Sequence, residues 1–294
     1  MILVTGSTGF VGRHVVKELS SRGIEVRCLA RSSSNLTPLN GLDISICYGD
    51  ITDQASLETA LENVEAVVHL VAIIRETKGA TFERINSLGT RNLVQVANKM
   101  RVNRLIYMSN LGANDNQSFP LLYSKWLGEQ EVIKSGIDFT ILQPSVMFGR
   151  GDGFVCLLAD IIKKLPVVPV IGSGKVKFQL ISVEDVASCI AASLQNKKTI
   201  NRIISLGGPD HLGYEEIINL IIQALKVKRI KVHVPVALMR SMVWAMEKIL
   251  RHTPVTSTQL SMLERDNITE VDVVERVFGF KPVSLRERIE SILT

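Results

Sequence analysis

The first twelve residues read MILVTGSTGFVG, and they constrain the fold more than any other part of the chain. A short apolar run ends at Val4 and leads into glycines at Gly6, Gly9 and Gly12, after which a helical pattern begins. Strand, glycine turn and helix in this order are the context in which a glycine motif binds a dinucleotide. Gly6 allows a sharp turn, Gly9 leaves room for a pyrophosphate to approach the backbone, and Gly12 lets the helix pack on the strand.

The start of that helix also favours a nucleotide, because unpaired N–H groups and a positive dipole end attract phosphate. The alternative interpretation is a loop that contains three glycines and binds no ligand. The flanking strand and helix favour the first interpretation. The turn residues that we expect to contact the nucleotide are Gly6, Ser7, Thr8, Gly9, Phe10, Val11 and Gly12.

Short runs of Val, Ile and Leu alternate with helical patterns through the first half of the chain. Strands that are apolar on both faces and separated by helices indicate a parallel sheet covered on both sides. The sequence therefore predicts an α/β fold with a doubly wound parallel sheet of the Rossmann type. The expected strands are Ile2–Val4, Glu25–Ala30, Ser45–Tyr48, Ala66–Leu70, Arg104–Ser109, Thr140–Pro144 and Ile203–Leu206. The expected helices of this part are Arg13–Ser21, Ser56–Leu61, Ser87–Lys99 and Lys125–Lys134.

After about residue 150 the alternation loosens, and three stretches read as loops: Gly149–Gly153, Pro166–Gly174 and Gly207–Gly213. We expect a dinucleotide-binding core over 1–150 and a smaller, mostly helical substrate or partner lobe over 151–294, with segments around 181–207 returning to the core. The default substrate site in such folds lies at the carboxyl ends of the strands, here between the two lobes. The helices expected after residue 150 are Val186–Leu194, Tyr214–Ala224, Ala237–Leu250 and Leu285–Leu293.

The end of the second strand selects the cofactor. An acidic residue there bonds the ribose of NAD, whereas an Arg suits the 2′-phosphate of NADP. This strand ends at Arg31, followed by three serines, and has no Asp or Glu at its end. A guanidinium matches phosphate in geometry and charge. We therefore expect NADP(H) rather than NAD(H), the alternative being a solvated loop cation.

The third strand leads into Gly49-Asp50-Ile51-Thr52-Asp53. Asp50 is placed to accept a hydrogen bond from the adenine amino group, with Ile51 against the ring. The alternative role for Asp50 is to cap the next helix, which Thr52 or Asp53 could also do.

Composition excludes several classes of protein. The net charge of +5 on 294 residues is spread along the chain without a basic block, so we expect no nucleic-acid partner. Four widely spaced cysteines lack metal-ligand spacing and indicate free thiols in a reducing compartment. No signal peptide and no apolar run long enough to span a bilayer is evident, so the sequence predicts a cytoplasmic protein, with peripheral membrane association as an option.

With these motifs in hand, the chain resembles the extended and atypical short-chain dehydrogenase/reductase superfamily. The matching stretches are TGSTGFVG, GDITD, VVHLVA, YMSNLGA, YSK and QPSVMFGRGD. The branch that it resembles includes the NADPH-binding accessory subunit of respiratory complex I, on the stretches IIRETKGATFERINSLGTRNL, LISVEDVA and FGFKPVSL. The resemblance implies further cofactor contacts from Val71, Ala72, Lys125 and Pro144.

The resemblance also implies a catalytic Ser, a Tyr acid/base and a Lys four residues after the Tyr. Ser109 and Lys125 match, but Leu121 stands at the Tyr position and Tyr123 lies only two residues before the Lys. Residues two apart on a helix point roughly 200° away from each other. Tyr123 therefore reaches the site only if the helix starts late. Gln143 also departs from the family pattern, in which Arg commonly precedes Pro144.

Two hypotheses for function remain. The first is an NADP(H)-dependent oxidoreductase or epimerase that acts on a hydrophobic or quinone-like substrate with Ser109, Lys125 and conditionally Tyr123. The second is a non-catalytic module for structure, assembly or redox sensing, which Leu121 favours. The helical stretch 236–251 is rich in Met, Leu and Trp, and reads either as a core-facing helix or as a contact surface for a protein, a hydrophobic ligand or a membrane.

Overall fold

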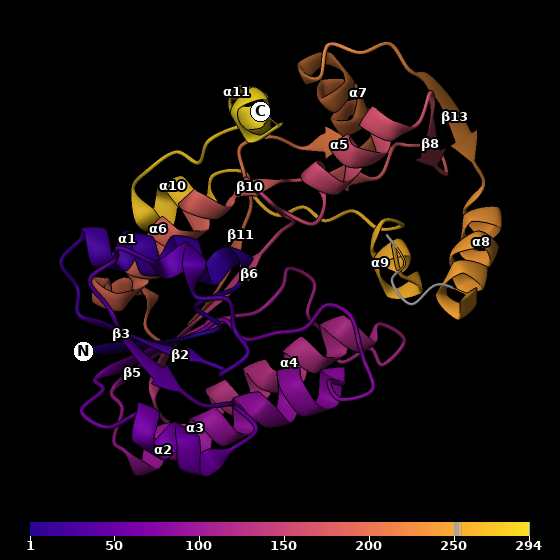
Figure 1. Cartoon of the computed structure of the whole chain (residues 1–294). Coiled ribbons are helices and arrows are strands. Elements are labelled where there is room, and N and C mark those ends of the chain that lie inside the picture. The colour runs from indigo at the N-terminus through magenta and orange to yellow at the C-terminus, as the bar shows by residue number, and fades with distance from the viewer. Residues whose placement is uncertain (250–252, 254, 294) are drawn as a thin grey trace. The chain divides into compact units, whose positions relative to one another are not determined.

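The computed structural model describes residues 1–249, 253 and 255–293 (Figure 1). The chain divides into two compact units. The first unit contains Met1–Pro144 and Val183–Leu206, and the second contains Ser145–Ser182 and Gly207–Thr294.

A seven-stranded sheet forms the centre of the first unit, with the order β11-β6-β5-β4-β1-β2-β3, and every neighbouring pair is parallel. The chain leaves β1 in one direction to β2 and β3, and in the other direction from β4 onward. The strand order therefore reverses between β1 and β4, and a doubly wound sheet binds ligands at the carboxyl ends of its strands at such a point. The strands are β1 (Ile2–Thr5), β2 (Val26–Ala30), β3 (Ser45–Tyr48), β4 (Ala66–His69), β5 (Arg104–Met108), β6 (Asp138–Pro144) and β11 (Arg202–Leu206).

Helices cover both faces of this sheet (Figure 1). On one face lie α1 (Phe10–Ser21) and α6 (Val183–Gln195), and on the other lie α2 (Gln54–Ala60), α3 (Gly89–Lys99) and α4 (Pro120–Ile133). Alternate residues of the strands point to opposite faces, so Leu3, Val67 and Leu105 join the core under α2, α3 and α4. All three are fully buried, and each stabilises the fold by about 1.5–3 kcal/mol. The short helical turns are η1 (Thr37–Leu39), η2 (Glu83–Leu88, a π-helix) and η3 (Lys197–Thr199).

The second unit is mostly helical, with three two-stranded sheets. Its strands are β7 (Met147–Phe148), β8 (Val167–Ile171), β9 (Lys177–Phe178), β10 (Ile181–Ser182), β12 (Leu212–Gly213) and β13 (Ile230–Val234). Its helices are α5 (Val155–Lys164), α7 (Tyr214–Ala224), α8 (Val236–Ile249), α9 (Ser257–Met262), α10 (Val273–Phe278) and α11 (Leu285–Leu293). A separate core includes Phe148, Phe178, Ile217 and Leu285.

The predicted fold class is confirmed, and the seven predicted strands all occur within two residues of their expected bounds. The loop predicted over Pro166–Gly174 is wrong, because β8 occupies most of it. Pro169 lacks an N–H, which an edge strand tolerates. Among the described residues β8 pairs with β13 alone, so one edge of β8 has no hydrogen-bond ladder to lose. The helices α5, α9 and α10 were not expected either. Leu250 and Arg251, at the end of the predicted stretch 236–251, lie outside the described residues.

Candidate functional site

The turn after β1 requires glycine at two positions for different reasons. Gly6 has a φ of +72°, and a Cβ added there would lie 3.0 Å from backbone atoms of Leu70 and Val71. A Cβ on Gly12 would overlap the carbonyl oxygen of Gly6 and lie 2.7 Å from Ser7. Backbone cannot give way as a flexible side chain can, so neither position tolerates a side chain. The result is a cradle of bare backbone at the carboxyl end of β1.

The start of α1 completes this cradle. The helix begins at Phe10, Gly9 precedes it as an exposed N-cap, and no side chain caps the helix start. The hydroxyl of buried Ser7 donates to a β2 carbonyl oxygen at 3.3 Å and so ties the turn to the sheet. Thr8 is half-buried and Val11 is buried. Uncapped N–H groups beside bare backbone suit an anionic phosphate, so these residues fit a bound dinucleotide.

His69, at the end of β4, is a neutral core residue. The Thr5 hydroxyl lies 2.7 Å from Nδ1 of His69, and the Thr90 hydroxyl lies 3.0 Å from Nε2. Because the Thr90 hydroxyl already donates to the carbonyl oxygen of Asn86, it accepts from Nε2–H, which fixes the tautomer. Burial, with a smaller contribution from the charge of Lys125, lowers the pKa of His69 to about 3. His69 therefore links β1, through Thr5, to α3, through Thr90. It stays neutral and does not act as a base at neutral pH.

The segment after β4 contains Val71 and Ala72, both half-buried. The side-chain amide of Asn86 accepts from the N–H of Ile73 at 2.9 Å and donates to the Ile73 carbonyl oxygen at 3.1 Å. The same amide donates to the Ser124 hydroxyl of α4 at 3.0 Å. Asn86 therefore fixes the backbone that follows β4 and ties it to α4.

The loop after β2 presents Arg31 to solvent. The N–H of Ser34 donates to the Arg31 carbonyl oxygen at 2.9 Å, and the Arg31 N–H donates to the Ser34 hydroxyl at 3.2 Å, so the loop is a closed turn. The guanidinium of Arg31 is exposed and has no ion pair within the part of the chain that the structure describes. It is thus available to an anionic group at the end of β2.

The segment after β3 has two carboxylates with different roles. Asp53 is the N-cap of α2 and accepts from the Ala55 N–H at 3.1 Å. Asp50 accepts from both the N–H and the hydroxyl of Thr52, each at 2.8 Å. Ile51 is 4% exposed and belongs to the core of the first unit. The cap is therefore Asp53, and the adenine contacts of Asp50 and Ile51 stay predictions.

Lys125, on α4, lies inside the first unit with 1% of its surface exposed. Its ammonium donates to the Met108 carbonyl oxygen at 2.6 Å and lies 4.4 Å from the centroid of the Tyr107 ring. Burial lowers the pKa of Lys125 to about 7, and the carboxylate of Glu129 partly opposes this shift. Near neutral pH this side chain exists as both ammonium and amine, as an acid–base group must.

Ser109 follows β5 and holds a buried polar atom with no partner. Its N–H donates to the Leu142 carbonyl oxygen at 2.7 Å. Its Oγ is the one buried side-chain polar atom without a hydrogen bond in the described ranges, although it lies close enough to Glu129 to lower the pKa of that carboxyl. The neighbouring loop is fixed by the Leu111 N–H, which donates to the carbonyl oxygen of buried Pro144 at 2.9 Å. An unpaired buried hydroxyl costs about 1–3 kcal/mol, which a ligand's hydrogen bond would offset.

Glu129 is the residue of this site that sequence reasoning missed. It is 3% exposed, and Gln143 donates from Nε2 to its Oε1 at 2.7 Å, while Ser205 donates to Oε1 of Gln143 at 3.3 Å. Burial raises the pKa of Glu129, and Gln143, Ser109 and Lys125 each oppose the shift. Its position four residues after Lys125 on one helix was the signal that could have revealed it.

The predicted catalytic residues are only partly brought together. Lys125 and Ser109 share the carboxyl end of β5, because Lys125 bonds the residue that precedes Ser109. Tyr123 is half-buried and stacks on Trp126, with ring centroids 5.9 Å apart and planes 19° apart. Since α4 is helical throughout, Tyr123 and Lys125 point to different sides of it. Leu121, four residues before Lys125, is buried.

Other kinds of site find no support in the described ranges. No group of three or more His, Cys, Asp and Glu residues there could hold a metal ion. Among the same residues, every helix is too short or too polar to cross a bilayer. The four cysteines, Cys28, Cys47, Cys156 and Cys189, are free thiols.

A family model matches residues 2–207 of the chain, which include the whole sheet and every residue of the candidate site described above. The chain belongs to the NAD dependent epimerase/dehydratase family. Membership in this family supports the binding of a nicotinamide dinucleotide at the glycine turn. It also agrees with the resemblance to the short-chain dehydrogenase/reductase superfamily.

Three members or fold neighbours of this epimerase/dehydratase family bear on the comparison. The chain is 27% identical over 280 residues to the mitochondrial NADH dehydrogenase [ubiquinone] 1 alpha subcomplex subunit 9 of Arabidopsis thaliana, covering 92% of this chain and 70% of that protein. It is 32% identical over 213 residues to the rat (Rattus norvegicus) subunit 9, covering 70% of this chain but only 56% of that one. The NADPH-dependent quinone oxidoreductase QOR2 of Escherichia coli, solved with NADPH, has a TM-score of 0.80 at 18% identity, and each chain is covered completely.

Proposed function

We propose that this chain binds NADP(H) at the glycine turn and reduces a hydrophobic, quinone-like substrate at the carboxyl end of β5. Two features support the nucleotide half of the proposal. The backbone cradle between Gly6 and Gly12 suits a pyrophosphate, and the exposed guanidinium of Arg31 suits a 2′-phosphate. The fold accommodates such a nucleotide in the Escherichia coli quinone oxidoreductase.

The observation that carries the catalytic half is the buried Ser109 hydroxyl without a partner, at the same strand end as the Lys125 ammonium. A bound reduced nicotinamide supplies hydride to the substrate. Ser109 would donate a hydrogen bond to a substrate carbonyl oxygen and so orient it. Lys125, with its pKa near 7, would deliver the proton or hold the negative charge that develops on that oxygen.

The substrate class follows from the missing tyrosine. Reduction of a simple ketone leaves an alkoxide, a strong base that needs a nearby acid in the transition state. Hydride addition to a quinone leaves a hydroquinone anion, whose charge is delocalised over the ring, so the demand on an acid is smaller. With Leu121 at the tyrosine position and Tyr123 stacked on Trp126, the site suits the second reaction better.

The buried Leu121 also favours a second candidate, a non-catalytic protein that holds the nucleotide for structure, assembly or redox sensing. Nucleotide binding alone would still matter, because a ligand that binds only the folded state stabilises it. The two candidates differ in turnover and not in affinity.

One set of measurements separates these proposals. We expect NADPH to raise the melting temperature of the purified protein more than NADH does, and Arg31→Ala to weaken NADPH binding roughly 10- to 100-fold while sparing NADH. Arg202→Ala, at the opposite end of the sheet, is the matched control. Equal stabilisation by both nucleotides would overturn the NADP(H) preference.

Turnover is then measured with NADPH and a short-chain benzoquinone, by the loss of nicotinamide absorbance. Steady oxidation of NADPH that depends on the quinone supports the reductase. Binding of NADPH without turnover of quinones or simple ketones would refute it in favour of the non-catalytic candidate.

We also propose a reducing compartment, the cytoplasm, because all four thiols are free. Cell fractionation tests this, and recovery of the protein in a secreted fraction would contradict it.

A further inference from the structure

The sheet of β8 and β13 exposes apolar side chains on one face. The two strands are parallel, with Ile230 opposite Val167 and Val232 opposite Pro169, so these four residues share a face. Ile230 is 68% exposed, and Val167 and Val232 are also exposed. The next residue of β8, Val168, points the other way and is buried in the core. One face of this small sheet therefore packs on the core of the second unit. The other face has no covering element in the described ranges.

Helix α8 follows β13 after one residue and exposes a second apolar stripe. Leu238, Met242 and Ile249 lie on one side of the helix and are 54%, 50% and 80% exposed. Trp244 is 57% exposed, whereas Val243 is buried. The apolar residues of this stretch are divided between the two interpretations: Val243 is buried against the protein, whereas Leu238, Met242 and Ile249 are exposed.

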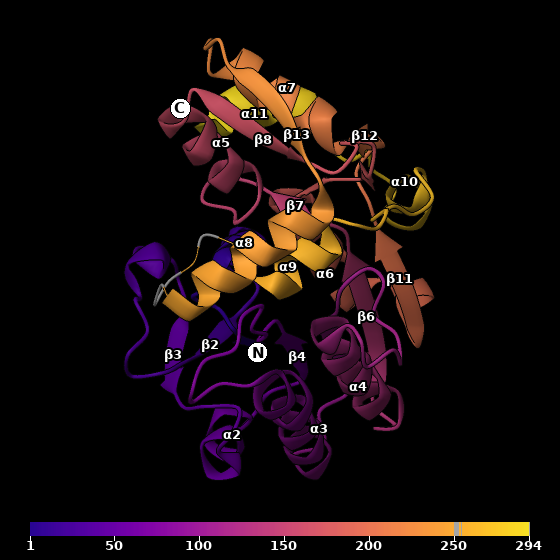
Figure 2. The same cartoon turned by 90° about the vertical axis from the view of Figure 1, so that its right-hand side faces the viewer.

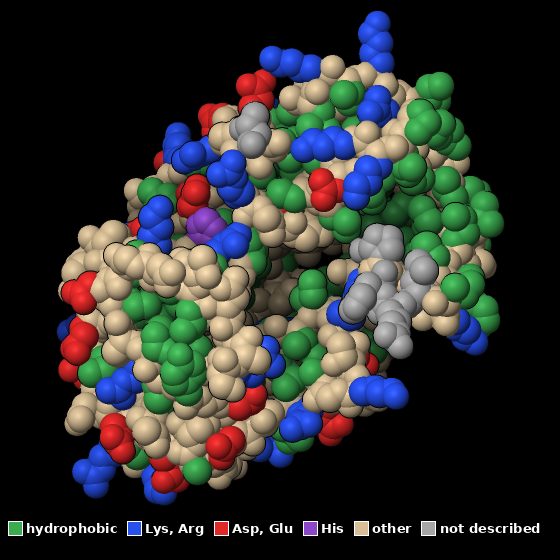
Figure 3. Space-filling model, viewed as in Figure 1, with side chains coloured by type: hydrophobic (Ala, Val, Ile, Leu, Met, Phe, Trp, Pro, Cys, Tyr) green, Lys and Arg blue, Asp and Glu red, His purple; other side chains and the backbone are tan. Residues whose placement is uncertain are grey.

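These two features form one surface, which we call the β13–α8 surface: Val167, Ile230, Val232, Leu238, Met242 and Ile249. In Figure 2 the strands β8 and β13 and the helix α8 all lie toward the viewer. Figure 3 shows hydrophobic side chains gathered along the side of the molecule that carries β13 and α8. A contiguous exposed apolar area of this kind marks an interaction site on a folded protein.

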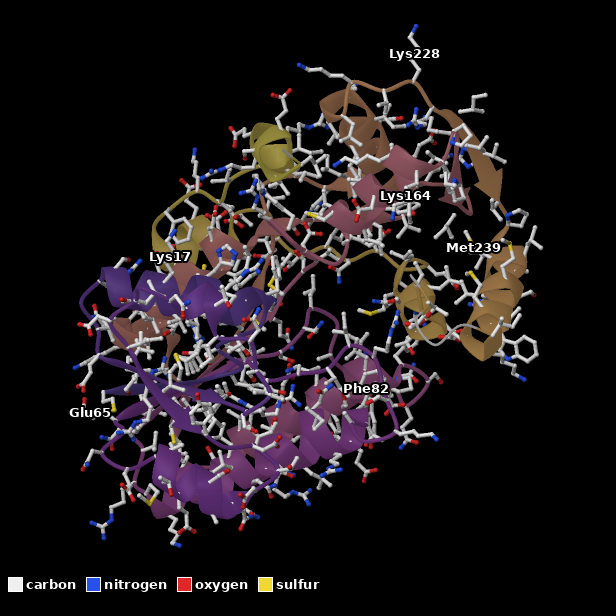
Figure 4. All side chains as sticks on the ribbon, viewed as in Figure 1. Lys17, Glu65, Phe82, Lys164, Lys228 and Met239 are labelled. Carbon is white, nitrogen blue, oxygen red and sulfur yellow. The ribbon has the colours of Figure 1, made fainter. Side chains whose placement is uncertain are left out.

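The charges around this surface are positive in excess, since Lys226, Lys228 and Lys248 have no ion pair among the described residues while Lys231 and Arg240 are paired with acidic residues. Between residues 226 and 248 the sequence has six Lys or Arg and a single acidic residue, Glu247. Lys228, before β13, extends away from the protein (Figure 4). Lys248 lies 3.9 Å from the centroid of the Trp244 ring, on another side of α8 from Leu238 and Met242. The acidic side chains nearby are already bonded: Glu247 accepts from Ser257, Glu215 pairs with Lys231 and Glu264 pairs with Arg240.

We propose that the β13–α8 surface docks on the anionic face of a lipid bilayer. Apolar side chains would enter the boundary between head groups and acyl chains, and the surrounding lysines would meet lipid phosphates. This docking is independent of the reaction proposed above, since none of its residues belongs to the first unit.

The test is co-sedimentation of the full chain with vesicles of phosphatidylcholine alone or with phosphatidylglycerol. We expect binding to the anionic vesicles that falls with added salt, and little binding to the neutral ones. Lys228→Gln should weaken it about fivefold, and Leu238→Ser by a similar factor. Lys134→Gln and Ile203→Ser, exposed residues of the first unit, are matched controls that should bind as the unmodified chain does.

Circular dichroism and the NADPH-induced thermal shift establish that each variant is folded. Equal binding by the surface and control variants would overturn the proposal. So would a concentration-dependent dimer that Leu238→Ser dissociates in the absence of any lipid binding, because the occupant would then be a second copy of the chain.

Discussion

Gln143 Nε2 donates a hydrogen bond of 2.7 Å to Glu129 Oε1, so a neutral amide supports a buried carboxyl in the first unit. The resemblance to the short-chain dehydrogenase/reductase superfamily implies Arg at the Gln143 position. A guanidinium there would hold the pKa of Glu129 down, whereas here burial raises it. With Gln at position 143, the cation that lowers the pKa of the Glu129 carboxyl is Lys125.

Removing the amide should therefore be costly. Gln143→Ala leaves buried Glu129 without that donor, and we expect a loss of about 1–3 kcal/mol in the free energy of unfolding. Urea denaturation at neutral pH measures this loss. Ser205→Ala removes only the outer hydrogen bond of the same chain and should cost less than about 1 kcal/mol. Equal losses in the free energy of unfolding for the two variants would show that the hydrogen bond to Glu129 contributes no more than the outer one.

Gly12→Ala tests the packing of the glycine turn. The new Cβ would overlap the Gly6 carbonyl oxygen, so α1 must shift away from β1, at a cost of about 1–3 kcal/mol and with loss of nucleotide binding. Thermal unfolding with and without NADPH measures both effects. Gly79→Ala is the control, because a Cβ there meets nothing within 4 Å. A Gly12→Ala protein that keeps its stability and its NADPH response would refute the steric argument.

The sequence was most informative where local pattern and tertiary role coincide. The central parallel strands are buried on both faces, so Val67, Leu105 and their neighbours appear as apolar runs that need no tertiary information. The glycine positions are equally local, since each reflects a backbone conformation or a close contact within a few residues along the chain, such as Gly12 with Gly6.

Prediction failed where the tertiary context decides. The segment around Pro169 has the composition of a loop, and only pairing with Ile230–Val234, sixty residues later, makes it a strand. The pattern of α8 indicates an apolar face correctly, but cannot say whether protein covers it. Glu129 reads as an ordinary helical carboxylate until the fold buries it beside Gln143.

The proposed roles of Ser109 and Tyr123 predict a large loss of kcat/KM for a Ser109 variant and almost none for a Tyr123 variant. Ser109→Ala removes the hydrogen bond to the substrate oxygen and should lower kcat/KM for the quinone roughly 10- to 100-fold. Tyr123→Phe keeps the stacking on Trp126 and should change kcat/KM less than about twofold. Steady-state kinetics with NADPH measures both. A large loss in Tyr123→Phe would show that the phenol takes part in the reaction.

The burial of Lys125 makes stability depend on pH in a predictable direction. Its pKa is about 7 in the folded protein and 10.5 for the free side chain, so between these values the unfolded chain binds more protons. Stability contributed by this group therefore rises as pH increases from about 7 to about 10.5, and the penalty of the buried ammonium is complete below about pH 7. Lys125→Met removes the penalty and fills the same volume, at the loss of one hydrogen bond to Met108.

We therefore expect Lys125→Met to be more stable than the unmodified chain at pH 6, by about 2 kcal/mol or more. This advantage should shrink toward pH 10 as the unmodified chain releases its proton on folding. Urea denaturation of both proteins across this range gives the difference, in which the titrations of all other groups largely cancel. Ile203→Ser, an exposed substitution that removes no titratable group, is the control, and its difference should stay flat across the range. A Lys125→Met advantage that is absent or independent of pH would mean that the buried lysine keeps an ordinary pKa, and would contradict its proposed exchange between ammonium and amine near neutral pH.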